Sequence, residues 1–254
     1  MKPQLIVGWV LLVLLALNRP AFAETKYTVL VQDYPSLPPY SSYQDADYQG
    51  FNRELLDLFA AHRGYTFDYV ALPVKRLHFE FSSGAGDLKY PDNPKWALSV
   101  KKDAKIVYSD PVVNYVNGVM VRPEDKGKPV DRIQSLGLVA GWTAIGYQES
   151  IEAGDVKLAE NNDYAGLLKQ TMFGRNDGAY SNVATSQYYL KNVLKKPGGL
   201  VFDESIPHVR ATRHLASVNR PELIEEFNAF LKSHGDQIES LKQKYAVEDG
   251  IPTN

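Results

Sequence analysis

Three short stretches in the first half of the chain carry most of the information about its fold. They read GFNRELL at residues 50–56, SGAGD at residues 83–87 and IVYSDP at residues 106–111. After Phe51, apolar residues recur at positions 55, 58 and 59 before Gly64, which predicts an amphipathic helix that ends at a glycine. The second stretch predicts a turn into a short strand, and the third predicts the end of a strand.

Strand and helix patterns alternate along the rest of the chain. Residues 112–121 are strand-rich, and residues 136–140 form a nearly continuous apolar run, typical of a parallel strand covered on both faces. This alternation predicts parallel sheets and an α/β class. Other expected strands are residues 27–31 and 66–72. The other expected helices are residues 73–84, one from near Ala144, residues 162–173, residues 182–191, one capped by Asn219 and a last one around residues 238–245.

The N-terminus has the pattern of a secretory signal peptide. Lys2 precedes an apolar stretch from Leu5 to Leu17, and Ala21-Phe22-Ala23 supplies the small residues of a cleavage site. A membrane anchor is the alternative, but 13 residues rise only about 20 Å as a helix, short of a hydrocarbon core of about 30 Å. We therefore expect cleavage after Ala23 and release into a periplasm.

The amino-acid composition limits which compartment and which kinds of partner we expect. The chain contains no cysteine, so the exported fold must rely on packing alone, and no cysteine next to the signal can carry a lipid. The formal net charge is −2, and removal of Lys2 and Arg19 with the signal makes it about −4. Because basic and acidic residues are interspersed, nucleic acid is excluded as an expected partner.

The order and spacing of these segments resemble the bacterial extracellular solute-binding proteins of family 3, which include amino-acid-binding proteins. The resemblance implies a two-lobed type II periplasmic-binding fold, with a ligand cleft between lobes that two hinge strands join. It divides the chain into a signal peptide (1–23), a discontinuous lobe 1 (24–120 and 205–254) and lobe 2 (121–204). It also implies a monomer that captures a small polar ligand, anionic or amino-acid-like, by hinge closure.

Three residues of the first lobe are candidates for ligand contact. Tyr34 and Tyr40 flank a proline-rich loop where the resembled family stacks an aromatic ring on its ligand, although either can simply cap the loop. Arg76 lies near the start of an expected helix, and its planar guanidinium can hold a carboxylate with two parallel hydrogen bonds. A solvated arginine on the helix surface is the alternative.

The segment after the Gly–Asp turn departs from the resembled family. Amino-acid-binding members carry an arginine there that clamps the ligand carboxylate, whereas this chain reads DLKYPDNP at residues 87–94 without an arginine. Lys89 can supply a point charge instead, and Tyr90 or Asn93 can donate hydrogen bonds. A capped turn without ligand contact is an equal alternative.

The second lobe supplies three further candidates. Trp142 and Thr143 follow Gly141 where the family has a glycine–threonine turn that opens a helix, and such a helix start can bind an anion. A buried tryptophan is the alternative. Asn182 stands where amino-acid binders have an aspartate for the ligand ammonium. Because an amide is neutral, Asn182 cannot supply that ion pair, which weakens the amino-acid interpretation.

The sequence gives little support for catalysis. It has no cysteine nucleophile, no Gly-x-Ser-x-Gly elbow and no metal-ligand spacing among its histidines, so we expect no catalytic residue, no metal and no cofactor. The expected partner is an inner-membrane permease of an ABC-type transporter. A sensing or stand-alone binding protein of the same fold is the alternative. A cyclohexadienyl-dehydratase-like enzyme would need an acid in the cleft, for which Glu54 is the candidate.

Overall fold

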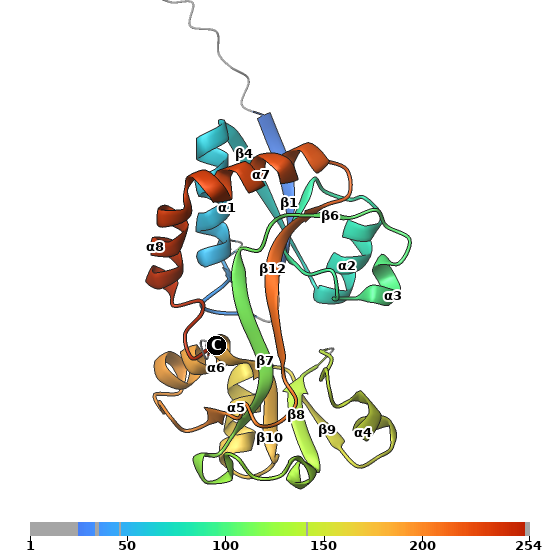
Figure 1. Cartoon of the computed structure of the whole chain (residues 1–254), viewed down its shortest axis with the longest axis vertical. Helices are drawn as coiled ribbons and strands as arrows, with labels where there is room; N and C mark the ends of the chain where they lie inside the picture. Colours follow the sequence, from blue (N-terminus) through green and yellow to red (C-terminus); the bar gives the residue numbers. More distant parts are fainter. Residues whose placement is uncertain (1–24, 34–35, 46, 141, 252–254) are drawn as a thin grey trace, which may run out of the picture.

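The computed structural model describes residues 25–33, 36–45, 47–140 and 142–251. Figure 1 shows two lobes of strands and helices, joined by the long strands β7 (Val113–Val121) and β12 (Val209–Ser217). The predicted signal peptide lies outside the described residues. Within the described ranges, no helix is both long and apolar enough to cross a membrane.

The first lobe is a sheet covered by helices on both faces. Its strands are ordered β4–β1–β5–β12, with β1 parallel to β4 and β5, and with β6 beside β12. Alternate residues of β1 face opposite sides, because Val29 and Val31 join the core beneath α1 and α7 whereas Leu30 packs with Leu77 of α2. The strands are β1 (Thr25–Gln32), β4 (Tyr65–Leu72), β5 (Leu88–Asp92) and β6 (Val107–Tyr108). The helices are α1 (Phe51–Arg63), α2 (Val74–Ser82), α3 (Leu98–Lys101), α7 (Pro221–Ser233) and α8 (Gly235–Tyr245), and a hairpin of β2 (Ser42–Gln44) and β3 (Asp47–Gln49) precedes α1.

The second lobe continues the hydrogen-bonded order as β7–β10–β8–β9, with β11 on the other side of β7. Here too the strands feed two separate cores, because Val116 and Met120 of β7 pack with α5 whereas Val119 and Val121 face Ala144 and Tyr147. The strands are β8 (Ser135–Val139), β9 (Lys157–Asn161), β10 (Gly178–Asn182) and β11 (Val201–Phe202). The helices are α4 (Gln148–Glu152), α5 (Tyr164–Met172) and α6 (Val183–Tyr188), which a π-helical turn (Tyr189–Val193) extends; two 3₁₀ turns (Pro123–Asp125 and Val130–Arg132) follow β7.

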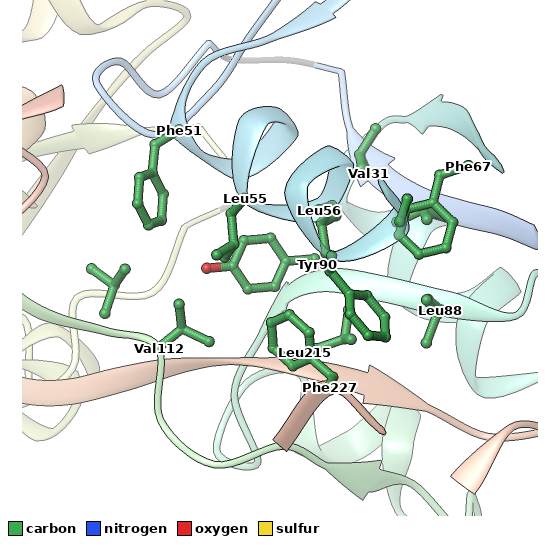
Figure 2. Packing of buried hydrophobic residues seen from close by; sticks show 14 of the residues in the cluster. Val31, Phe51, Leu55, Leu56, Phe67, Leu88, Tyr90, Val112, Leu215 and Phe227 are labelled. Carbon is green, nitrogen blue, oxygen red and sulfur yellow. The ribbon is translucent and has the colours of Figure 1, made fainter. Parts of the chain in front are cut away.

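The main core of the first lobe lies beneath α1. Figure 2 shows Leu55 and Leu56 of α1 above the ring of Tyr90, with Val112 and Leu215 below it. Phe59, on the same helix, is fully buried and its ring centre lies 5.1 Å from that of Phe227 in α7. The apolar periodicity after Phe51 therefore marks the buried face of α1, as the sequence predicts.

The helix ends show where local sequence is sufficient and where it is not. Gly64 ends α1 in the left-handed conformation, as predicted. The helix expected from near Ala144 begins only at Gln148, because Gly146 adopts a φ of +91° within a turn. Asn219 does not cap α7: its side chain donates to the Gly84 carbonyl at 2.7 Å, and Pro221 begins the helix.

Asp87, from the Gly–Asp turn, ties the first strand to the last helices. One carboxylate oxygen accepts the Thr28 N–H at 2.8 Å, and the other lies 3.0 Å from Nε of Arg220, just before α7. We expect Asp87→Ala to lower the free energy of unfolding by about 1–3 kcal/mol, because it leaves the Thr28 N–H without its acceptor. Urea denaturation measures this loss.

Asp68→Ala is the matched control for Asp87→Ala. Asp68 pairs with Lys26 at 3.2 Å, but both side chains are more than half exposed. Such a surface pair contributes about 0–1 kcal/mol. Equal losses in the two variants would show that Asp87 has no special structural role.

Candidate functional site

A buried arginine lies where the two lobes meet. Arg213, on β12, is 4% exposed, and its guanidinium carbon lies 3.7 Å from the centre of the Tyr40 ring. The Tyr115 ring of β7 lies on the same group at 5.5 Å. Two aromatic faces therefore surround a cation that is always ionised in proteins.

Strand register explains why this arginine points inward. Side chains of a strand alternate between faces, so Arg213 shares its face with Leu215, which belongs to the main core of the first lobe. Arg213 pairs with Val113 and Ala211 pairs with Tyr115, which sets the tyrosine beside the arginine across the two strands. Long-range pairing of β7 with β12 therefore builds the site.

The chain around Gly50 holds Tyr40 in place. The Tyr40 carbonyl accepts the Asn52 N–H at 2.9 Å, at the start of α1. Gly50 has a φ of +103°, and a Cβ atom at this position would lie 2.8 Å from the Tyr40 oxygen. Only glycine can adopt this φ angle and lie so close to the Tyr40 carbonyl, which explains why a glycine stands at position 50.

Asn182 faces Tyr40 from the second lobe. Its side-chain oxygen accepts the Thr185 N–H at 3.0 Å and so caps α6, whereas its amide nitrogen donates to Asn117 of β7 at 3.2 Å. Burial raises the pKa of Tyr40, and the Arg213 charge and the nearby Asn182 amide oppose that rise. Tyr40, Arg213 and Asn182 thus form one electrostatic group across the two lobes.

The lobes also touch through apolar residues. Leu37, from the loop that follows β1, is 8% exposed and packs within the cluster of the second lobe that contains Val116 and Val183. The chain after α8 makes a second contact, because Val247 is buried in the first-lobe core and Ile251 packs against the second-lobe cluster. The junction is therefore closely packed on both sides of the polar group.

Lys89 lies in a separate buried network of the first lobe. It is 1% exposed, and its Nζ lies 3.0 Å from Asp92 and 3.1 Å from Nδ1 of His78. Lys101 binds the same Asp92 oxygen at 2.6 Å and lines an open surface pocket of about 190 Å³. Burial would raise the pKa of Asp92, but the two lysines outweigh it and lower that pKa. The charge that was expected to meet a ligand is thus already paired inside the protein.

The other first-lobe residues predicted to contact a ligand lie in different environments. Tyr34 lies outside the described residues. The side chain of Arg76 is 65% exposed and pairs with Glu80 of the same helix at 3.2 Å, so Arg76 is not part of the buried group. Tyr90 is fully buried beneath α1, and the Asn93 side chain donates to the Thr212 carbonyl at 2.7 Å.

The expected anion site at Gly141–Thr143 lacks its helix. Thr143 is exposed, and the residues that follow it form a turn rather than the first turn of a helix. Trp142 is half-buried between the two second-lobe clusters, with its ring centre 5.8 Å from that of Tyr164. Tyr164 in turn accepts the Asn182 N–H at 2.9 Å, so Trp142 borders the junction through this tyrosine and the cluster that contains Leu37.

Sequence reasoning missed Arg213, Tyr115 and Asn117. All three lie on the joining strands, and their grouping depends on strand pairing rather than on local spacing. One sequence feature could have pointed to Arg213: it lies two residues before the apolar Leu215, so both side chains share one face of the strand. In the described part of the chain, no group of three or more His, Cys, Asp or Glu side chains is arranged to hold a metal ion.

Solved structures show which fold this arrangement belongs to. The ancestral amino acid-binding protein AncCDT-1, a precursor of cyclohexadienyl dehydratase, matches with 18% identity, a TM-score of 0.65 and coverage of 87% of this chain and 95% of its own. The arginine-, lysine-, histidine-binding protein ArtJ of Geobacillus stearothermophilus matches with 15% identity, a TM-score of 0.67 and coverage of 87% and 95%. The periplasmic VFT2 domain of Bordetella pertussis BvgS matches with 19% identity, a TM-score of 0.65 and coverage of 87% and 93%.

These matches confirm the expected fold class. The chain has the two-lobed type II periplasmic-binding fold, and its structural neighbours include amino-acid-binding proteins. No protein-family model matches the sequence, and no curated protein matches it closely enough to count as a relative. At such low identities the structural likeness establishes the fold and leaves the function to be argued from the site.

The buried network makes stability depend on pH through His78. Burial, with a smaller effect of the Lys89 charge, lowers the pKa of His78 from 6.5 to about 3. Between these values the unfolded chain binds a proton that the folded protein does not, so stability falls as pH falls. We expect His78→Gln to reduce this acid sensitivity by at most about 2 kcal/mol between pH 7 and 5.

Urea denaturation of wild type and His78→Gln at pH 7 and pH 5 measures this difference. Carboxylates titrate alike in both proteins, so subtraction isolates the histidine. An identical loss of stability in both would contradict a neutral, buried His78.

Proposed function

We propose that this protein is a periplasmic solute-binding protein that captures a small polar ligand between its lobes by hinge closure. The observation that carries the proposal is the polar group at the junction, to which Tyr40 contributes from the first lobe and Asn182 from the second. Arg213 joins them from a connecting strand. Small ligands are commonly held at such interdomain junctions, where closure buries them.

The moving parts follow from the connections. We propose that the lobes expected from the sequence (24–120 with 205–254, and 121–204) move against one another, and that bending occurs in β7 and β12 where residues 113–117 pair with residues 209–213, because residues 117–120 of β7 already pair with β10 of the second lobe. The lobe contact at Leu37 is apolar and that at Asn182 is polar, so opening separates side chains without breaking either sheet. Movement about a few strand residues is the usual geometry of hinge closure.

We propose that the captured solute is either delivered to a transporter or sensed. The default partner is an inner-membrane permease of an ABC-type transporter, and we expect the binding protein to act as a monomer. A sensing or stand-alone role is the second candidate, because residues 87–94 contain no arginine clamp and position 182 is a neutral asparagine. The predicted signal peptide, together with the neighbours' fold, supports a periplasmic location.

Catalysis is a weaker candidate. A dehydratase of this fold would need a carboxylic acid that donates a proton, and Glu54 was the only glutamate expected near the mouth. Hydrogen bonds from Lys244, at 2.7 and 2.9 Å, and from Tyr245 lower the pKa of Glu54. Glu54 is therefore held as a carboxylate in the contact between α1 and α8, which does not suit a general acid.

A solute panel tests the proposed function. We expect one class among amino acids, organic acids, peptides and sugars to raise the melting temperature of the mature protein, because a solute that binds only the folded state stabilises it by mass action. The same solute should reduce the radius of gyration in X-ray scattering, as the lobes close. Stabilisation without compaction would argue against hinge closure, and no stabilisation by any class would contradict solute binding.

A further inference from the structure

We propose that Arg213, with the hydroxyl groups of Tyr40 and Tyr90, anchors a carboxylate of the captured solute. The ligand class is then a small organic acid that is recognised without a partner for an ammonium group. This inference rests on the proposed function, because it assigns the ligand of the same junction. The anchor comes from a joining strand, not from the segment after the Gly–Asp turn.

Arg213 is a buried charge without an anion. Its Nε is buried without a hydrogen-bond partner, and its guanidinium forms no ion pair with any carboxylate among the residues that the structure describes. Burying an ionised group is costly unless it is paired, and the Tyr40 ring face offsets only part of that cost. In contrast, Lys89 and Lys101 share Asp92 at 3.0 and 2.6 Å. The protein thus neutralises its other buried cations but leaves Arg213 to an external anion.

Two buried hydroxyls beside Arg213 also lack partners. The hydroxyl groups of Tyr40 and Tyr90 are both buried without a hydrogen bond of normal geometry in the described part of the chain. The Arg213 guanidinium lies over the Tyr40 ring at 3.7 Å, and Tyr90 belongs to the same buried cluster as Tyr40. Burial raises the pKa of both tyrosines, and the Arg213 charge opposes the rise in each. In Figure 2 the Tyr90 hydroxyl points toward the Phe51 and Val112 end of the core.

The chemistry of these three groups selects an acceptor. An arginine can only donate, and the raised pKa values keep both tyrosines protonated, so their O–H groups are donors as well. A carboxylate accepts hydrogen bonds through both oxygens and carries the compensating charge, so it satisfies every unmet need of the cluster.

The surroundings do not favour an ammonium group. Asn182 is neutral, and the acid that acts on Tyr40 electrostatically is Glu248. Its carboxylate accepts the Asn114 N–H at 2.7 Å and lies 3.7 Å from Lys242, so its charge is already engaged. The carboxylate of an amino acid would therefore gain from this cluster, whereas its ammonium would meet no unengaged acid among the described residues that act on Tyr40.

The test compares wild type with five variants, three at the site and two controls. Arg213→Met removes the charge, Tyr90→Phe removes one hydroxyl without changing shape, and Arg213→Lys keeps the charge but loses the planar fork. Arg175→Met and Tyr147→Phe are the controls: Arg175 is exposed, and Tyr147 is buried in the second lobe with an unpartnered hydroxyl. Calorimetric titration uses succinate, malate and butyrate, their neutral amides, arginine and glucose.

We expect at least one of the acids to bind wild type and its neutral amide not to bind. Arg213→Met should weaken that binding about 10- to 100-fold, with a smaller loss in Tyr90→Phe and Arg213→Lys and none in the controls. Without solute, Arg213→Met and Tyr90→Phe should be at least as stable as wild type, because each removes a buried group that has no partner. A merely structural arginine would instead leave acid binding intact and lower stability when replaced.

The remaining outcomes of the titration would each contradict one part of the proposal. Binding of glucose or arginine, but of no acid, would overturn the carboxylate assignment and leave the solute-binding function standing. Equal affinity of an acid for wild type and Arg213→Met would remove Arg213 from the site. Binding of nothing in this panel overturns the acid class, and the wider panel above then decides whether solute binding itself fails.

Discussion

The antiparallel pairing of β7 with β12 is the constraint on which the rest of the structure depends. Residues 113–117 of β7 pair with residues 209–213 of β12, and each strand then enters a different set of neighbours. This pairing holds the lobes in register and sets Tyr115 beside Arg213. A binding group placed on the connecting strands is close to both lobes whatever their relative position, which fits the proposed hinge closure.

The buried charged groups of the first lobe are of two kinds. Toward α2, Lys89, Lys101 and Asp92 form a network in which opposite charges meet at 2.6–3.0 Å. Toward the second lobe, Arg213 has aromatic faces and protonated tyrosines around it, but no described carboxylate. The first arrangement pairs its charges within the protein, whereas the second holds a cation without a described anion. That difference is the physical basis for the proposed anionic solute.

Local sequence was sufficient wherever one short segment decides a feature. The apolar spacing after Phe51 and the glycine at position 64 define α1, and the apolar run at 136–140 identifies β8, which spans Ser135–Val139. It failed where distant segments compete for a residue. Asn219 bonds the turn at Gly84 instead of capping its own helix, and His78 of α2 lies 3.1 Å from Lys89, which also pairs with Asp92 of its own strand. Arg213 carries no local motif, because its burial follows from strand pairing and from the Tyr40 ring that α1 holds in place.

Relative movement of the lobes about β7 and β12 is the central claim, and an interlobe distance tests it most directly. The chain has no cysteine, so spin labels can be placed at Asp103→Cys, after α3, and at Asp155→Cys, after α4. Figure 1 shows α3 and α4 on the same side of the joining strands. The account predicts a distance distribution that shortens and narrows when a bound solute is added, while two labels within one lobe stay unchanged. A single interlobe distance that no bound solute alters would contradict it.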